Sequence, residues 1–227
     1  MISRDLSLRG ARHPGCGTGG DVWLLRHAQV HERWEGIAYG SLDVPLSTQG
    51  EIETAETARR FARLPLRAVL SSTLARARAL GEALAGASGA PLLASGELRE
   101  IDRGAWQGMA VRELLERRAD EVAAFYADPW GWNGHGGETD RDVLARVWPA
   151  LESALERHGP PIAVATHYNV IRALLGRAIG MDPADTFRLR VDLGGACLVR
   201  DTDSGWELRR LNVRSPDAPG SGSRQAG

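Results

Sequence analysis

The sequence contains no lysine, and all 28 of its cationic side chains are arginines. This absence excludes a P-loop, whose lysine contacts the terminal phosphates of a nucleotide, and any mechanism through a lysine Schiff base. The two cysteines, Cys16 and Cys197, are too few and too far apart to form a disulfide framework or a zinc cluster. No apolar run approaches the roughly 20 residues of a membrane span, and the N-terminus lacks the apolar core of a signal peptide. We therefore expect a cytoplasmic protein that does not bind membranes.

No excess of charge of either sign is present, because 28 cations and 29 anions are interleaved along the chain. Nucleic-acid-binding proteins normally carry a basic stripe, so we expect no nucleic acid and a small molecule as the partner. A chain of 227 residues, 43% of them hydrophobic, suits one domain. Residues 1–20 and 215–227 are rich in Gly, Pro and Ser, which predicts disordered tails around a domain of residues 21–214.

Short apolar runs alternate with helical patterns along the domain. The runs are bounded by Pro, Gly or Ser, as is typical of strands buried on both faces, and they span residues 21–25, 67–72, 91–95 and 161–166. The main helical patterns span residues 48–64, 73–87 and 139–158. Residues 187–213 alternate in a strand-like way, which suggests antiparallel additions. The pattern predicts an α/β fold with three layers, α/β/α, around a mainly parallel central sheet with an antiparallel edge near the C-terminus.

Two of the helical segments predict finer details. Thr48 precedes Glu51 by three residues, the spacing of a capping box. The segment "VRELLERRADEVAAFYA" (111–127) has a helical period whose apolar stripe we expect to be buried. That stripe consists of Leu114, Leu115, Val122 and Phe125. The arginines of the same segment are expected to face solvent.

Polar side chains follow all four predicted parallel strands. Arg26 and His27 follow the first, "SSTLARAR" (71–78) overlaps the end of the second, Glu97–Glu100 follows the third and His167 follows the fourth. In open α/β sheets the ligand crevice lies at the carboxyl ends of the strands, so these residues should converge. One guanidinium group can donate to two phosphate oxygens at once, and a neutral imidazole can attack phosphorus. The sequence therefore predicts a site that forms phosphohistidine.

Six segments resemble, in the expected order, the motifs of the histidine phosphatase superfamily, which includes the cofactor-dependent phosphoglycerate mutases. They are "LLRHAQV" (24–30), "YGSLDVPLSTQG" (39–50), "SSTLARA" (71–77), "LREIDRGAWQG" (98–108), "GGET" (136–139) and "ATHYNVIRALL" (165–175). Together they extend over most of the predicted domain. The resemblance implies phosphoester chemistry that needs neither a metal nor another cofactor.

The resemblance also implies a role for each matching residue. His27 would be the nucleophile that is transiently phosphorylated. Glu100 would be the general acid, which protonates the leaving alkoxide and then, as a carboxylate, accepts a proton from the attacking water. Arg26, Arg76 and His167 would hold the phosphoryl oxygens and meet the charge that develops on them.

The chain departs from the family pattern in the loop after the first strand. Ala28 stands where the family usually has glycine, Arg33 where mutases have an asparagine that contacts phosphate, and Tyr39 where a small polar residue is common. We expect Arg33, Tyr39 and Gly40 to contribute to substrate binding. In the alternative interpretation, Arg33 is a solvated loop cation and Tyr39 packs on Trp34.

The resemblance favours hydrolysis, because residues 109–135 are shorter than the insertion that mutases carry at this place. Residues 177–200 are similar to the corresponding stretch of α-ribazole-phosphate phosphatases, which makes α-ribazole phosphate a candidate substrate. A phosphoglycerate mutase-type phosphotransferase and a non-catalytic phosphate-binding module are the alternatives. In each case the partner is a small phosphorylated metabolite, and a homodimer is compatible with the sequence.

Two further alternatives concern single residues. His27 and His31 have the i, i+4 spacing of a zinc-binding helix, but an apolar strand precedes them and leaves little room for a helix. Glu100 could be structural, paired with Arg99 or Arg103, rather than a proton donor. We also expect His135, which lies among glycines, to face solvent.

Overall fold

Six strands form one mixed sheet in the order β3-β2-β4-β1-β5-β6. The computed structural model describes residues 20–203 and 205–217, so the predicted tails lie almost entirely outside the described residues. The strands are β1 (Asp21–Arg26), β2 (Ala68–Ser72), β3 (Leu92–Ser95), β4 (Ile162–Thr166), β5 (Ala196–Thr202) and β6 (Gly205–Val213). The first four are parallel, whereas β5 runs antiparallel to β1 and β6 antiparallel to β5. The predicted sheet, including its antiparallel edge, is confirmed.

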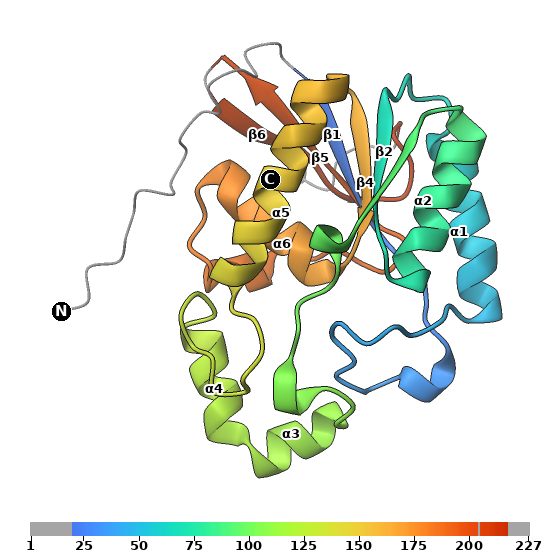
Figure 1. Ribbon diagram of the computed structural model, residues 1–227. Coiled ribbons are helices and arrows are strands. Elements are labelled where there is room, and N and C mark those ends of the chain that lie inside the picture. Colours follow the sequence, from blue (N-terminus) through green and yellow to red (C-terminus); the bar gives the residue numbers. More distant parts are fainter. Residues whose placement is uncertain (1–19, 204, 218–227) are drawn as a thin grey trace, which may run out of the picture.

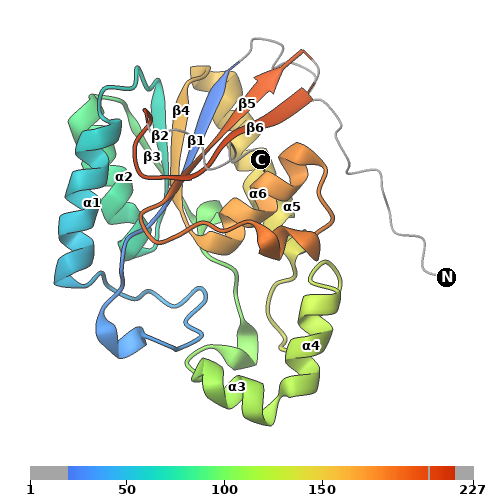
Figure 2. The same cartoon turned by 180° about the vertical axis from the view of Figure 1, so that it is seen from behind.

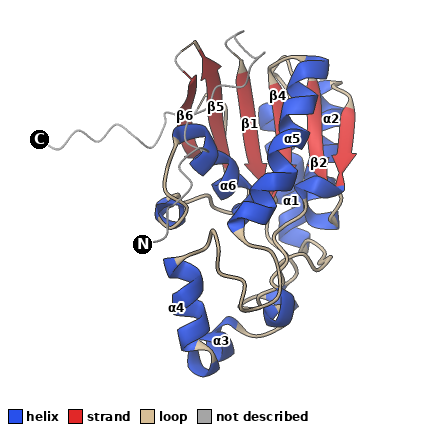
Figure 3. Cartoon of the chain, turned by 60° about the vertical axis from the view of Figure 1, so that its left-hand side comes forward, coloured by secondary structure: helices blue, strands red, loops and turns tan. Residues whose placement is uncertain are grey.

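Helices cover both faces of the sheet (Figure 1). The α-helices are α1 (Thr48–Phe61), α2 (Ala75–Ser88), α3 (Val111–Arg117), α4 (Ala119–Ala127), α5 (Asp140–His158) and α6 (Tyr168–Ile179). Short 3-10 helices are η2 (Glu32–Trp34), η3 (Gly96–Leu98), η4 (Gly104–Trp106) and η5 (Asp185–Arg188). The pair α1 and α2 covers one face, and the pair α5 and α6 covers the other (Figure 3). This arrangement confirms the predicted three layers.

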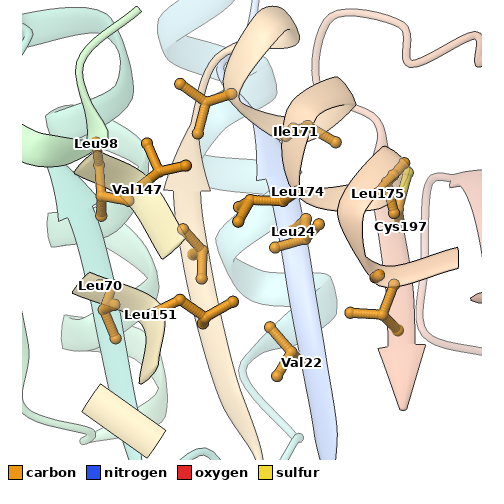
Figure 4. Packing of buried hydrophobic residues seen from close by; sticks show 14 of the residues in the cluster. Val22, Leu24, Leu70, Leu98, Val147, Leu151, Ile171, Leu174, Leu175 and Cys197 are labelled. Carbon is orange, nitrogen blue, oxygen red and sulfur yellow. The ribbon is translucent and has the colours of Figure 1, made fainter. Parts of the chain in front are cut away.

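Alternate residues of β1 build the two halves of the core. Val22 and Leu24 pack with α5 and α6, as Figure 4 shows, whereas Trp23 and Leu25 pack with α1 and α2. Both sets are almost completely buried, because strands in the middle of a three-layer fold have no face toward water. The near-continuous apolar runs of the sequence follow from this burial.

The first turn of α1 differs from the prediction. Ser47, not Thr48, is the N-cap, and its hydroxyl accepts a hydrogen bond from the backbone N–H of Gly50 at 3.0 Å. The helix therefore begins one residue earlier than the predicted capping box requires. The third helical position is Gly50, so Glu51 lies one residue too far along to complete the box. A capping box is present instead at α5, where Thr139 and Asp142 exchange both hydrogen bonds.

The segment of residues 111–127 lies beyond the carboxyl ends of the parallel strands (Figures 1 and 2). It is broken at Arg118, whose φ of −134° is not helical, so it forms two short helices rather than one. Each of the two helices buries its own apolar residue, Leu114 in α3 and Phe125 in α4, so the predicted single apolar stripe is wrong in part. Leu114 and Phe125 are buried, but Leu115 is 55% exposed. Within the described residues, no helix is long and apolar enough to cross a membrane.

A buried ion pair joins α5 to α6. The guanidinium of Arg172 donates to both carboxylate oxygens of Asp140 at 2.6 Å, and both side chains are almost fully buried. Thr186 accepts a further hydrogen bond from Arg172 at 2.7 Å. Removing one partner of such a pair leaves the other charge buried without compensation.

We expect Arg172→Met to lower the free energy of unfolding by about 3–5 kcal/mol, because Asp140 would stay buried alone. The matched control is Arg78→Met, which removes an exposed pair with Glu82 and should cost less than about 1 kcal/mol. Urea denaturation of both variants measures the difference. Equal losses would show that the buried pair does not hold the two helices together.

Candidate active site

The carboxyl ends of the parallel strands bring five predicted residues to one edge of the sheet. Arg26 ends β1 and is followed by His27, and His167 follows β4. Arg76 lies in the first turn of α2, directly after β2, and Glu100 follows η3 after β3. The backbone N–H of His27 donates to the carbonyl of Thr166 at 3.1 Å, which continues the β1–β4 ladder. The rings of His27 and His167 consequently lie 5.2 Å apart between centroids.

His27 is a buried, neutral imidazole with a defined lone pair. Its Nδ1 lies 2.8 Å from the carbonyl of Ala28, which can only accept, so Nδ1 carries the proton and Nε2 the lone pair. Burial, together with the charges of Arg76 and Arg26, holds the pKa of His27 well below its usual value, although the carbonyl opposes this. A neutral imidazole whose Nε2 is unprotonated is the form that can act as a nucleophile.

Arg76 is completely buried beside His27. Its Nε donates to Nε2 of His27 at 3.3 Å, and its two terminal nitrogens donate to the carbonyls of Leu42 and Gly40, each at 2.8 Å. Among the described residues no carboxylate forms an ion pair with it. Its charge is thus held by neutral acceptors and is available to an anion.

Two more nitrogens at this edge lack a hydrogen-bond partner within the described part of the chain. They are Nδ1 of the fully buried His167 and Nε of Arg26. The other ring nitrogen of His167 lies 2.8 Å from the hydroxyl of Ser72, and Arg26 donates to the carbonyl of Val191 at 2.6 Å. Buried polar atoms normally have partners, so these nitrogens are candidates for binding the oxygen atoms of a ligand.

Glu100 is 7% exposed and is held by backbone donors. Its Oε1 accepts from the N–H of Ile101 at 2.9 Å, and its Oε2 accepts from the N–H of Asn169 at 3.4 Å. It forms no ion pair with Arg99 or Arg103 in the described structure, so the structural pairing considered above is wrong. Arg99 is exposed and donates to the carbonyl of Gly96.

An ion pair that sequence reasoning missed fixes the segment that carries Glu100. Arg146 donates to both carboxylate oxygens of Glu138 at 2.7 and 2.9 Å, and also to the carbonyl of Glu100 at 3.4 Å. Glu138 in turn accepts from the backbone N–H of Asp102 at 2.9 Å. The "GGET" motif contains Glu138, but nothing in the sequence pairs it with Arg146.

The loop residues expected to bind substrate lie at different depths. Arg33 is exposed on η2, and its guanidinium carbon lies 5.1 Å from the centroid of the Trp34 ring. Tyr39 lies instead beneath the guanidinium of Arg76 at 5.0 Å. Gly40 supplies its carbonyl to Arg76, and its φ of +42° suits glycine.

The described histidines outside this cluster do not form a metal site. His31 accepts from the backbone N–H of Arg33 at the start of η2, and no helix joins it to His27, so the zinc-helix alternative is wrong. Within the described residues no three His, Cys, Asp or Glu side chains could hold a metal ion. His135, expected at the surface, is 2% exposed and packs edge-on against Trp106 at 4.8 Å.

The comparison with known families agrees with this geometry. The model of the histidine phosphatase superfamily (branch 1) matches residues 22–214. The chain belongs to this superfamily. Phosphoserine phosphatase 1 of Hydrogenobacter thermophilus is 29% identical over 191 residues, which make up 84% of this chain and 90% of that protein.

Other similar histidine phosphatase superfamily chains differ in the activity that they are named for. A probable phosphoglycerate mutase of Salmonella choleraesuis is 26% identical over 208 residues, covering 87% of this chain and 95% of that protein. The crystal structure of a putative alpha-ribazole-5'-P phosphatase from Escherichia coli is 25% identical with a TM-score of 0.75, covering 86% of this chain and 97% of that chain.

Proposed function

We propose that this histidine phosphatase superfamily member hydrolyses a small phosphomonoester, without a metal, through a phosphohistidine on His27. The observation that carries the proposal is the neutral, buried imidazole whose Nε2 lone pair lies beside three cations or donors. These are Arg76, Arg26 and His167, and the last two have nitrogens free to bind oxygen. A tetrahedral anion is the ligand that this set fits.

The reaction proceeds in two steps. First, Nε2 of His27 forms a bond to phosphorus, the bond from phosphorus to the ester oxygen breaks, and the carboxylic acid of Glu100 gives its proton to the leaving oxygen. Next, the carboxylate of Glu100 accepts a proton from water while the water oxygen bonds to phosphorus. The bond to His27 then breaks, which releases inorganic phosphate and restores both residues.

The arginines supply the charge stabilisation that a metal supplies in other phosphatases. Arg26 and Arg76 carry permanent positive charges, Arg76 being fully and Arg26 partly buried, and each donor pre-aimed at such a site is typically worth about 10²–10³ in rate. A phosphate-binding module would need these cations but neither a nucleophile nor an acid. The presence of both His27 and Glu100 therefore favours an enzyme.

Hydrolysis is favoured over mutase activity by the segment of residues 111–127, which lies beyond the carboxyl ends of the parallel strands. A mutase must hold an intermediate that carries a second phosphate, which requires further cations over the site, and must protect its phosphohistidine from water. The arginines of α3, Arg112 and Arg117, are exposed and pair with Glu116 and Glu113 on the same helix. Their charges are therefore matched within their own helix.

The fate of the phosphoryl group tests hydrolysis directly. We expect purified protein to release inorganic phosphate from members of a panel that contains α-ribazole phosphate, phosphoserine and p-nitrophenyl phosphate. With 3-phosphoglycerate, added 2,3-bisphosphoglycerate should not stimulate formation of 2-phosphoglycerate. Isomerisation that exceeds phosphate release would move the protein to the mutase class.

Glu100→Gln tests the proton donor. It should slow the hydrolysis of alkyl phosphates by about 10²–10⁴, but that of p-nitrophenyl phosphate much less, because nitrophenolate hardly needs protonation to leave. The matched control is Glu97→Gln, an exposed carboxylate on the same segment, which should leave both rates unchanged. Equal losses on the two kinds of ester in Glu100→Gln would remove it from the role of acid.

A further inference from the structure

Arg103 is a largely buried cation that the mechanism above does not use. Its guanidinium lies 4.4 Å over the ring of Phe125 on α4, and its Nη2 donates to Oδ1 of Asn169 at 3.1 Å. Its Nη1 is buried and has no hydrogen-bond partner among the described residues, and no carboxylate of that part of the chain lies within ion-pair distance. Such a guanidinium lacks the anion that normally accompanies it in a buried site.

Asn169 ties Arg103 to the proton donor. Its side-chain oxygen accepts from Arg103, and its backbone N–H donates to Oε2 of Glu100 at 3.4 Å. The same oxygen accepts from Arg172 at 3.3 Å, but the charge of Arg172 is matched by Asp140. Arg103 is thus held in place by a network that leaves its own charge unmatched.

The stem of Arg103 passes the edge of the phosphoryl site. A Cβ on Gly40 would lie 3.0 Å from Cγ of Arg103, and the carbonyl of Gly40 binds Arg76. Glu100 marks the side of the site that the leaving group occupies, because it protonates the ester oxygen. Arg103 shares Asn169 as a hydrogen-bond partner with Glu100, which places it near that side.

We propose that Arg103 binds a carboxylate on the leaving group, so that the preferred substrate is the phosphate ester of a small hydroxy acid. The inference rests on the proposed phosphatase function and narrows its substrate class. Nη1 offers the unused donor, and an Arg–carboxylate pair is among the stronger polar contacts in a dry site. The ring of Phe125 packs against the flat face of the guanidinium, and the N–H groups on the edge of the guanidinium would donate to the carboxylate.

The electrostatics of Arg103 agree with this assignment. Burial lowers the pKa of the Arg103 guanidinium, and the charge of Glu100 opposes that effect without forming an ion pair. Burial deprives the guanidinium of water, and a bound carboxylate would stabilise its charge in place of that water. α-Ribazole phosphate carries no carboxylate on its leaving group and would leave Nη1 unpaired, so this inference favours hydroxy-acid phosphates over it.

The test compares esters that differ only in the carboxylate. Phosphoserine and phosphoethanolamine form one such pair, and phosphoglycolate and ethyl phosphate form a second with a methyl in place of the carboxylate. We expect the wild-type kcat/KM to favour the acidic member of at least one pair by about ten-fold or more, as a charged hydrogen bond typically provides. In Arg103→Met the preference should fall to within about three-fold of unity.

Two further variants complete the experiment. Arg99→Met removes an exposed arginine from the same segment and should keep the wild-type preference. If Arg103→Met does not fold, as judged by its thermal transition, Arg103→Lys takes its place. Lysine keeps the charge but lacks the paired N–H donors of a guanidinium, so the preference for the acidic ester should be reduced. Wild-type turnover of both members without preference in either pair would overturn the role of Arg103 alone. The same holds for an unchanged preference in a folded Arg103 variant. Absence of phosphate release from every ester, p-nitrophenyl phosphate included, would instead overturn the phosphatase function itself.

Discussion

The parallel pairing of β1 with β4 is the constraint on which the rest of the site depends. Leu24 faces Val164 and Arg26 faces Thr166 in this register, so both strands end at the same level of the sheet. The hydrogen bond from His27 to Thr166 extends the pairing by one residue and sets two imidazoles side by side. A slip of one residue would turn His27 toward the opposite face, because side chains of a strand alternate.

Burial then gives the side chains at this level their chemical character. His27 stays neutral because it is desolvated and adjoins two arginines. Arg76 keeps its charge against carbonyl oxygens, which stabilise a cation without neutralising it. Arg172, on the helix α6 that follows His167, has the opposite arrangement, because the carboxylate of Asp140 neutralises its charge. The two kinds of buried arginine therefore serve different purposes: one awaits an anion, and the other joins two helices.

Much of this arrangement could be predicted from sequence, because it follows from local patterns. Buried parallel strands read as short apolar runs, and the residues directly after them must meet at one edge, so Arg26, His27 and His167 are found from their positions alone. The N-cap of α1 could not be decided, since Ser47 and Thr48 are neighbouring hydroxyl residues that can both cap. The exposure of Leu115 depends on the break at Arg118, which no glycine or proline announces.

The missed contacts are those that join distant segments. Asn169 links the loop of Glu100 to α6, and Glu138, which Arg146 of α5 holds, links that helix to the same loop by accepting from the N–H of Asp102. Neither contact has a periodic signal, because each depends on how the loops between strands and helices are folded. The unpartnered Nη1 of Arg103 is likewise visible only once its surroundings are known.

The most direct test of the central claim is the detection of phosphate on His27 during turnover. Brief reaction with a labelled phosphomonoester, quenched without acid, should leave an adduct that is labile to acid and stable to base. Peptide mass spectrometry should place it on His27. His27→Asn should abolish the adduct, whereas the control His31→Asn, at the exposed start of η2, should form it normally. An adduct of full level in His27→Asn, or turnover by that variant at the wild-type rate, would contradict the account.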